Sequence, residues 1–277
     1  MSKLCRWAVG IALAFNVSAS AVWGDTLDNV KKKGVLVVGT KVDYAPFGFK
    51  DAQGNIIGLE PDLAADVAKR LGVKLELVPV TSANRMAFLQ EGKIDLMIAT
   101  MSVSDEREKV VGIVKPHYYA TRISVIARKD ANLRDETDLD GQRICSLAGA
   151  FFNARLQAEF THQDLILFKS VPEIEAALAQ KQCVGFVFDD VLLIYKKRTE
   201  AEKWRDYDLI ELTEFDPVPW GIAVKLEEKN TAWGQLISRM VTDWLKSDTL
   251  LNLEQKWLSQ NTTWLKAVHI RMSAAPR

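Results

Sequence analysis

The stretch KLELVPVTSANRMAFLQEGKIDLMIAT, residues 74–100, contains two strand-like segments separated by a helix-like one. Residues 74–78 and 96–100 have the length and apolar character of strands, whereas residues 84–90 have a helical pattern. Strands that are separated by helices are typical of α/β proteins, in which the strands lie mostly parallel in one sheet. The stretch therefore predicts a first α/β unit.

The same alternation extends from this stretch in both directions. Before it, residues 35–39 predict a buried strand and residues 62–71 a helix that ends at Gly72. The segment after Trp264 has no clear pattern and predicts a loosely held terminus. Between these ends a second α/β unit and a C-terminal segment are expected, with strands at 143–147, 165–168, 184–188, 208–212 and 221–224 and helices at 151–160, 172–180, 190–198, 231–246 and 249–258.

The composition is that of a packed globular protein. Of the 277 residues, 48% are hydrophobic and 26% are charged, and 36 basic residues balance 36 acidic ones. A protein that binds nucleic acid or a membrane surface usually carries an excess of basic residues, so neither partner is expected. The length suits one large domain or two ordinary ones.

The N-terminus has the layout of a secretory signal peptide. Lys3 and Arg6 precede an apolar run at 7–17, and small residues follow at 18–24. A membrane anchor would need about 20 consecutive apolar residues, and this run is shorter. Cleavage after residue 21 or after residue 24 fits the small-residue rule, and the second site is preferred, so residues 1–24 are predicted to leave the mature protein. Export is the consequence.

Two cysteines, Cys145 and Cys183, remain after the signal peptide takes Cys5 with it. An oxidising compartment favours a disulfide between them, whereas two buried thiols are the ordinary alternative. The predicted export favours the disulfide.

A series of short motifs resembles the polar amino-acid family of bacterial solute-binding proteins, the extracellular components of ABC transporters. The resemblance covers residues 27–258, and its strength lies in the order of the motifs. They are VVGT at 37–40, YAPFGF at 44–49, GLEPDLA at 58–64, GKIDL at 92–96, TMSVSDER at 100–107, YY at 118–119, DLDG at 138–141, DD at 189–190, WGIAV at 220–224 and EQKW at 254–257.

This resemblance implies an α/β fold of the periplasmic-binding-protein type, with two lobes that are each a mostly parallel sheet with flanking helices and that are joined by two hinge strands. Lobe 1 would be discontinuous, at 25–123 and 218–277, and lobe 2 would lie at 124–217. The protein would be a periplasmic monomer that captures an amino acid between the lobes by hinge closure and delivers it to a membrane permease. Some family members carry a disulfide at the place of Cys145 and Cys183.

The resemblance also implies which residues hold the ends of the amino acid. Arg107 matches the arginine that binds the α-carboxylate, for which its fork of donors is suited. Thr100 and Ser102 can offer a carbonyl and a hydroxyl, although they could also cap a helix. Asp189 is expected to bind the ammonium, with Asp190 as its rival and a helix cap as the alternative role of Asp190.

Further residues are expected to surround the ligand. Tyr44 matches an aromatic wall, with core packing as its alternative role. The segment Gly149, Ala150 and Phe151 begins the helix expected at 151–160, and it lacks the hydroxyl residues that the family often has there, so only its backbone N–H groups could hold the carboxylate.

Three residues suggest an acidic ligand. Lys41, Ser82 and Arg85 fall where glutamate- and aspartate-binding relatives recognise the side-chain carboxylate. The alternative is that Lys41 and Arg85 point to solvent or pair with Asp43 and Glu60, which would leave a pocket for a neutral or basic amino acid.

Two other functions on the same fold are weighed against binding. A periplasmic dehydratase would need a positioned acid or base, but His117, His162 and His269 are isolated in sequence and the acidic candidates have binding or capping roles. A sensing domain of a receptor would normally be joined to a membrane segment and a signalling domain. Neither a cofactor nor a metal is expected, and a binding protein that is not an enzyme remains the prediction.

Overall fold

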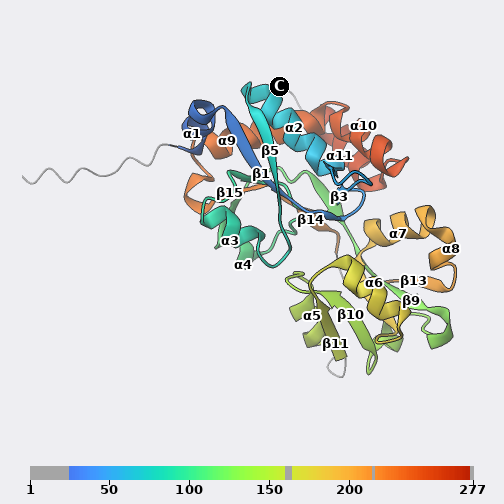
Figure 1. Cartoon of the computed structure of the whole chain (residues 1–277). Helices are drawn as coiled ribbons and strands as arrows, with labels where there is room; N and C mark the ends of the chain where they lie inside the picture. The colour runs from blue at the N-terminus through green and yellow to red at the C-terminus, as the bar shows by residue number, and fades with distance from the viewer. Residues whose placement is uncertain (1–24, 160–163, 214–215, 275–277) are drawn as a thin grey trace, which may run out of the picture.

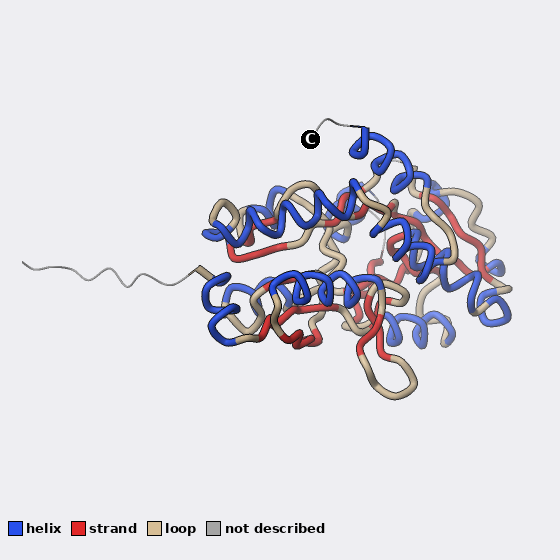
Figure 2. Tube along the Cα trace, turned by 90° about the horizontal axis from the view of Figure 1, so that it is seen from above, coloured by secondary structure: helices blue, strands red, loops and turns tan. Residues whose placement is uncertain are grey.

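The computed structural model describes residues 25–159, 164–213 and 216–274. The predicted signal peptide at 1–24 lies outside these residues. Figure 1 shows two bodies of helices packed on sheets, and Figure 2 shows the same chain from above. We call the body that contains the N-terminal strand lobe 1 and the other body lobe 2.

Lobe 1 is built on a five-stranded sheet in the order β5-β1-β6-β15-β7. Strand β1 pairs in parallel with β5 and β6, and β15 is antiparallel to β6 and β7. The strands are β1 (Val35–Thr40), β5 (Lys74–Pro79), β6 (Leu96–Met97), β7 (Val111–Ile113) and β15 (Ala223–Lys225), and the helices are α1 (Thr26–Lys33), α2 (Leu59–Leu71), α3 (Arg85–Gln90), α4 (Asp105–Glu108), α9 (Ala232–Lys246), α10 (Thr249–Leu258) and α11 (Thr263–Ala274). Between β1 and α2 the chain forms a small three-stranded sheet of β2 (Asp43–Tyr44), β3 (Gly48–Lys50) and β4 (Ile56–Ile57).

Lobe 2 is built on a second five-stranded sheet in the order β11-β10-β12-β9-β13. Strand β10 pairs in parallel with β11 and β12, and β9 is antiparallel to β12 and β13, so both sheets are mixed. The strands are β9 (Ile123–Arg128), β10 (Arg143–Leu147), β11 (Asp164–Phe168), β12 (Gly185–Asp189) and β13 (Tyr207–Glu211), and the helices are α5 (Asn153–Glu159), α6 (Val171–Ala179), α7 (Asp190–Thr199) and α8 (Ala201–Trp204).

Two neighbouring strands carry the chain between the lobes, as expected of a hinge. Strand β8 (Tyr119–Thr121) leads into lobe 2, and β14 (Val218–Trp220) leads back to lobe 1. They pair in antiparallel register, with Val218 opposite Thr121 and Trp220 opposite Tyr119. The predicted α/β fold with two lobes is therefore confirmed, and the residue limits of the lobes stay a prediction.

Two segments near the C-terminus differ from the sequence prediction. The strand expected at 221–224 is observed two residues later, as β15, and Gly221 and Ile222 lie between β14 and β15. The loosely held terminus expected after Trp264 is instead helix α11, in which Leu265 is buried and His269 contacts the carbonyl of Leu245 on α9 through Nδ1 at 3.1 Å. This long-range packing gives order to a segment that has little amphipathic pattern of its own.

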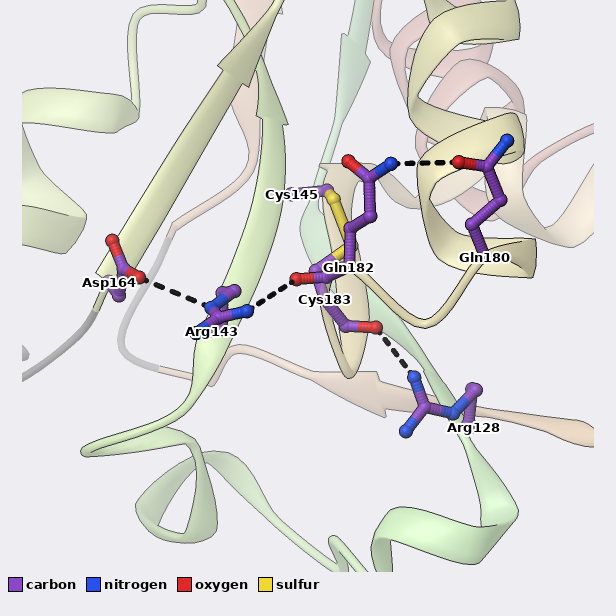
Figure 3. The surroundings of a disulfide bond; sticks show 7 residues. All are labelled: Arg128, Arg143, Cys145, Asp164, Gln180, Gln182 and Cys183. Carbon is purple, nitrogen blue, oxygen red and sulfur yellow. Dashed lines mark hydrogen bonds and ion pairs between the residues drawn. A yellow bond between two sulfur atoms is a disulfide. The ribbon is translucent and has the colours of Figure 1, made fainter.

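The predicted disulfide between Cys145 and Cys183 is present in lobe 2, and both residues are buried. Cys145 lies in β10 and Cys183 lies just before β12, the neighbouring strand (Figure 3). The segment around Cys183 is also held by arginines, since Arg128 donates to the carbonyl of Cys183 at 2.7 Å and Arg143 to that of Gln182 at 3.3 Å. Within the described ranges, no helix is long and apolar enough to cross a membrane.

Candidate functional site

A narrow pocket, with a cavity volume of about 20 Å³, lies where the two lobes meet. Its lining combines polar side chains of lobe 1 with apolar side chains and one carboxylate of lobe 2. The lining residues are Ser82, Arg85, Thr100, Ser102, Leu147, Ala150, Phe151, Phe152, Phe188 and Asp189. Seven of these residues were predicted from the sequence to bind the ligand. Of the other predicted residues, Lys41, Tyr44 and Arg107 each contact a lining residue. Gly149 belongs to the same loop as the lining residues Ala150 and Phe151.

Arg107 connects the two lobes at the edge of this pocket. It lies in α4, whose start is capped by Ser104, and its side chain is buried. One terminal nitrogen donates to the carbonyl of Ser102 at 2.8 Å, and the other donates to the carbonyl of Gly149 in lobe 2 at 2.9 Å. Burial lowers the pKa of the Arg107 guanidinium to about 10, so the group remains a cation at neutral pH. Because a guanidinium has five N–H donors, these two bonds leave it able to bind an anion.

Asp189 ends β12 and is the carboxylate of the pocket. Its Oδ2 accepts a hydrogen bond from the hydroxyl of Tyr44 at 2.8 Å, while Oδ1 is buried and has no hydrogen-bond partner among the described residues. Burial raises the pKa of the Asp189 carboxyl to about 7. The ionised form therefore needs a cationic partner, which an ammonium group would supply.

Asp190, the rival of Asp189, is directed to the hinge. Its Oδ1 accepts from the hydroxyl of Thr121 at 2.6 Å and from the backbone N–H of Arg122 at 3.2 Å. It therefore binds the chain between β8 and β9, and it is absent from the pocket lining.

Tyr44 combines the two roles that were weighed for it. Its ring is fully buried and packs edge-on against Phe188, with centroids 5.1 Å apart, and it also packs against Phe47 and Trp220. Its hydroxyl reaches across the lobes to Asp189. Tyr44 is thus a core residue whose hydroxyl group contacts the site.

The loop at 149–151 differs from the prediction at the start of its helix. Helix α5 begins at Asn153, two residues later than expected, and the N–H of Ala150 donates to the carbonyl of Leu147 at 3.1 Å. The Gly149 carbonyl accepts from Arg107, and Gly149 has a φ of +79°, in the left-handed region. The expected helix N-terminus is therefore absent at 149–151, because a turn precedes the helix there.

The two cations expected to select an acidic side chain are buried and have protein partners. Lys41 is 1% exposed, lies 3.2 Å from Asp43 and donates to the hydroxyl of Ser82 at 3.3 Å. Arg85 donates to the carbonyl of Ala99, and burial lowers the pKa of its guanidinium to about 9. Neither residue points to solvent. The pairing of Lys41 with Asp43 is the arrangement that the alternative interpretation required.

Glu60 was not predicted as a site residue, although it lies in a quoted motif and was named as a partner for the cations. It is fully buried, and its Oε1 accepts from the backbone N–H of Thr100 at 2.6 Å and from the hydroxyl of Tyr118. Burial raises the pKa of the Glu60 carboxyl to about 7. A charged residue among the apolar positions of the motif at 58–64 was the sequence signal that could have identified it.

Comparisons with known proteins identify the family and the fold. The family model described as bacterial extracellular solute-binding proteins, family 3, matches residues 36–260. A glutamine-binding protein of Geobacillus stearothermophilus is 29% identical over 211 residues, which are 74% of this chain and 78% of the relative. A glutamate/aspartate import solute-binding protein of Salmonella typhimurium is 26% identical over 214 residues, 73% of this chain and 70% of the relative.

A solved structure also has the same fold. The arginine-bound form of a truncated ArgBP from T. maritima superposes with a TM-score of 0.70 and 27% sequence identity, and the match covers 78% of this chain and 99% of that chain. The named ligands of these three proteins have a neutral, an acidic and a basic side chain, so the likeness indicates a fold and a class of protein that accommodate very different side chains.

Proposed function

Because this chain belongs to family 3 of the bacterial extracellular solute-binding proteins, we propose that it binds an amino acid between its lobes and delivers it to the membrane permease of an ABC importer. The relatives whose names state a ligand bind amino acids. The proposal includes export to the periplasm through the signal peptide at 1–24 and action as a monomer.

The observation that carries this proposal is the presence of a cation and an anion from different lobes at one small pocket, with Arg107 bound to the lining residue Ser102 and Asp189 in the lining itself. The two groups are buried, come from different lobes and are close enough for the Asp189 charge to act on the pKa of Arg107. A cation and an anion at the two sides of a pocket suit the carboxylate and ammonium groups that all α-amino acids share. The apolar walls at Phe151, Phe152 and Phe188 would exclude water from both contacts.

The side chain of the ligand is the finer part of the proposal. An acidic amino acid, glutamate or aspartate, would use Ser82 and Arg85 with Lys41 behind them. The ion pair between Lys41 and Asp43 favours the second candidate, an amino acid with a neutral side chain, because a cation that is already balanced gains little from a second anion.

Calorimetric titration with the standard amino acids and cystine tests the proposal. We expect saturable binding of at least one amino acid with one ligand per chain. Native mass spectrometry of gently purified protein provides a second readout, since a retained amino acid would be weighed directly. Absence of binding throughout the panel would contradict the proposal, and chemical conversion of the bound molecule would favour the dehydratase alternative.

A further inference from the structure

Glu60 and Arg85 bind opposite sides of one peptide group at the pocket. The carbonyl of Ala99 accepts from the Arg85 guanidinium, and the N–H of the next residue, Thr100, donates to Glu60 at 2.6 Å. Both side chains are buried. Thr100 has a φ of +45°, which is uncommon for a residue with a branched side chain, so this peptide is held in a restricted conformation.

Ionisable groups of both signs surround this peptide. The buried cations at or beside the pocket are Lys41, Arg85 and Arg107, and the nearby carboxylates are Asp43, Glu60 and Asp189. A zwitterion with a neutral side chain adds no net charge to this group of residues. An additional side-chain carboxylate beside Arg85 would place a second negative charge near Glu60, and an uncompensated buried charge is costly.

We infer that Glu60 is a specificity-determining positioning residue. When Glu60 is ionised, its charge compensates that of Arg85, and a ligand with a neutral side chain is favoured. When Glu60 is protonated, Arg85 has lost this counter-charge and can bind a side-chain carboxylate of the ligand. The inference rests on the proposed function and deepens it. Glu60 itself acts through Arg85 and does not line the pocket.

Glu60 is placed so that this exchange can occur near neutral pH. The groups that face it are Arg85 on α3, Lys41 after β1, Tyr118 before β8 and Tyr44 on β2. Burial raises the pKa of the Glu60 carboxyl to about 7 despite the hydrogen bonds and the two cations, which act in the opposite direction. One oxygen, Oε2, has no hydrogen-bond partner among the described residues and could carry the proton.

The test compares L-glutamate with L-glutamine, which have nearly the same shape and differ in charge. Calorimetric Kd values are measured between pH 6 and pH 8, where the glutamate side chain stays ionised because its ordinary pKa is about 4.3. Glutamate should bind with uptake of up to one proton, so its affinity relative to glutamine should rise by up to about tenfold for each pH unit of acidification. The ratio matters because Asp189, whose carboxyl pKa burial also raises to about 7, is proposed to bind the ammonium group that both ligands share, so its protonation should weaken both ligands alike.

Two variants separate the charge of Glu60 from its structural role. Glu60→Gln keeps an oxygen for Thr100 and Tyr118 but cannot ionise, so the glutamate-to-glutamine affinity ratio should become higher at pH 8 and independent of pH. Tyr118→Phe keeps the carboxyl and removes a hydrogen bond that lowers its pKa, so the midpoint of the pH profile should move upward. Thermal unfolding verifies that each variant is folded, and the wild-type and Tyr118→Phe profiles suffice if Glu60→Gln does not fold.

A ratio that stays constant from pH 6 to pH 8 in the wild type would overturn the inference, and so would an unchanged pH profile in folded Glu60→Gln. Binding of other amino acids without measurable binding of either probe would overturn it too, while leaving the proposed function intact. Binding of no amino acid at all would instead contradict the proposed function.

Discussion

At the scale of the residue, Arg107 is both the proposed carboxylate partner and a link between the lobes. Its two terminal nitrogens bind backbone carbonyls at Ser102 and Gly149. Replacing it with alanine would remove the shared carboxylate partner and one interlobe contact, so every amino-acid ligand should be affected.

We therefore expect Arg107→Ala to weaken each ligand by about 2–5 kcal/mol, the usual cost of leaving a buried charge without its partner. Calorimetry with the amino acid that binds the wild type most tightly measures the loss. Arg70→Ala is the matched control, because Arg70 on α2 is partly exposed and pairs with Asp66 and Asp243 away from the pocket. Wild-type affinity in folded Arg107→Ala would remove this residue from the site.

The buried carboxyl groups of Glu60 and Asp189 also contribute to the dependence of stability on pH. Because burial raises the pKa of Glu60 and of Asp189 to about 7, the folded state keeps their protons between the ordinary carboxyl pKa and pH 7, where the unfolded state has lost them. The two carboxyl groups therefore stabilise the folded state at low pH. This contribution decreases as the pH rises from the ordinary carboxyl pKa, and it is lost once the pH has passed through 7. His117, whose pKa burial lowers, acts in the opposite direction.

Ligand-free protein should consequently resist urea better at pH 5.5 than at pH 8, by on the order of 2 kcal/mol for each of the two carboxyl groups. Urea unfolding followed by circular dichroism at both pH values measures the difference. The pH dependence should be smaller in Asp189→Asn. Greater stability at pH 8 than at pH 5.5 in the wild type would show that the two groups are not protonated in the folded state.

At the scale of the element, helix α11 is a part of lobe 1 that depends on tertiary packing. Leu265 is 1% exposed, and Trp264 packs against Tyr119 of the hinge strand β8 with ring centroids 5.8 Å apart. The backbone N–H of Thr262, just before the helix, donates to Glu254 on α10 at 2.8 Å. The helix is thus attached both to the neighbouring helices and to the hinge.

Leu265→Ala should therefore destabilise the protein by about 2–5 kcal/mol, because it opens a cavity under α11. Ile270→Ala is the control on the same helix, since Ile270 is 67% exposed and its replacement should change stability by less than about 0.5 kcal/mol. Chemical unfolding gives both values. Equal and small effects of the two substitutions would mean that α11 is not packed on lobe 1 in solution.

At the scale of the whole molecule, the structure has the two lobes in contact. Tyr44 donates to Asp189 and Arg107 donates to Gly149, in both cases between the lobes. A side chain added at Gly149 would lie 2.9 Å from the carbonyl carbon of Ser82 and 3.0 Å from Cα of Ala83, which are backbone atoms of lobe 1. The close approach of the lobes at this point therefore requires a residue without a side chain.

Gly149→Ala should hinder closure and weaken ligand binding by roughly tenfold or more, because only the closed arrangement brings the two backbones together. Small-angle scattering should show that ligand reduces the radius of gyration of the wild type and reduces that of Gly149→Ala less. Gly141→Ala is the matched control in lobe 2, since Gly141 has a similar φ of +74° and no atom lies within 4 Å of an added Cβ. The same loss of affinity in both variants would indicate backbone strain as the cause.

The class of fold and most of its elements could be predicted from the amino-acid sequence alone. Strand β10 and helix α10 have the predicted bounds, and most other predicted strands and helices begin and end within a few residues of those bounds. These features are encoded by the spacing of apolar residues along a short segment, which needs no knowledge of distant contacts. The ordered motifs, together with Cys145 and Cys183, were sufficient for the family and for the disulfide.

The contacts that build the site depend on tertiary packing and could not be predicted from the sequence. The contact of Glu60 with Thr100 spans 40 residues, that of Arg107 with Gly149 spans 42, and that of Tyr44 with Asp189 spans 145. The late start of α5 and the order of α11 depend on such contacts as well. A local pattern shows that a residue is charged or apolar. Whether a charge is balanced depends on its burial and on its long-range partners, and both are fixed only when the two lobes pack together.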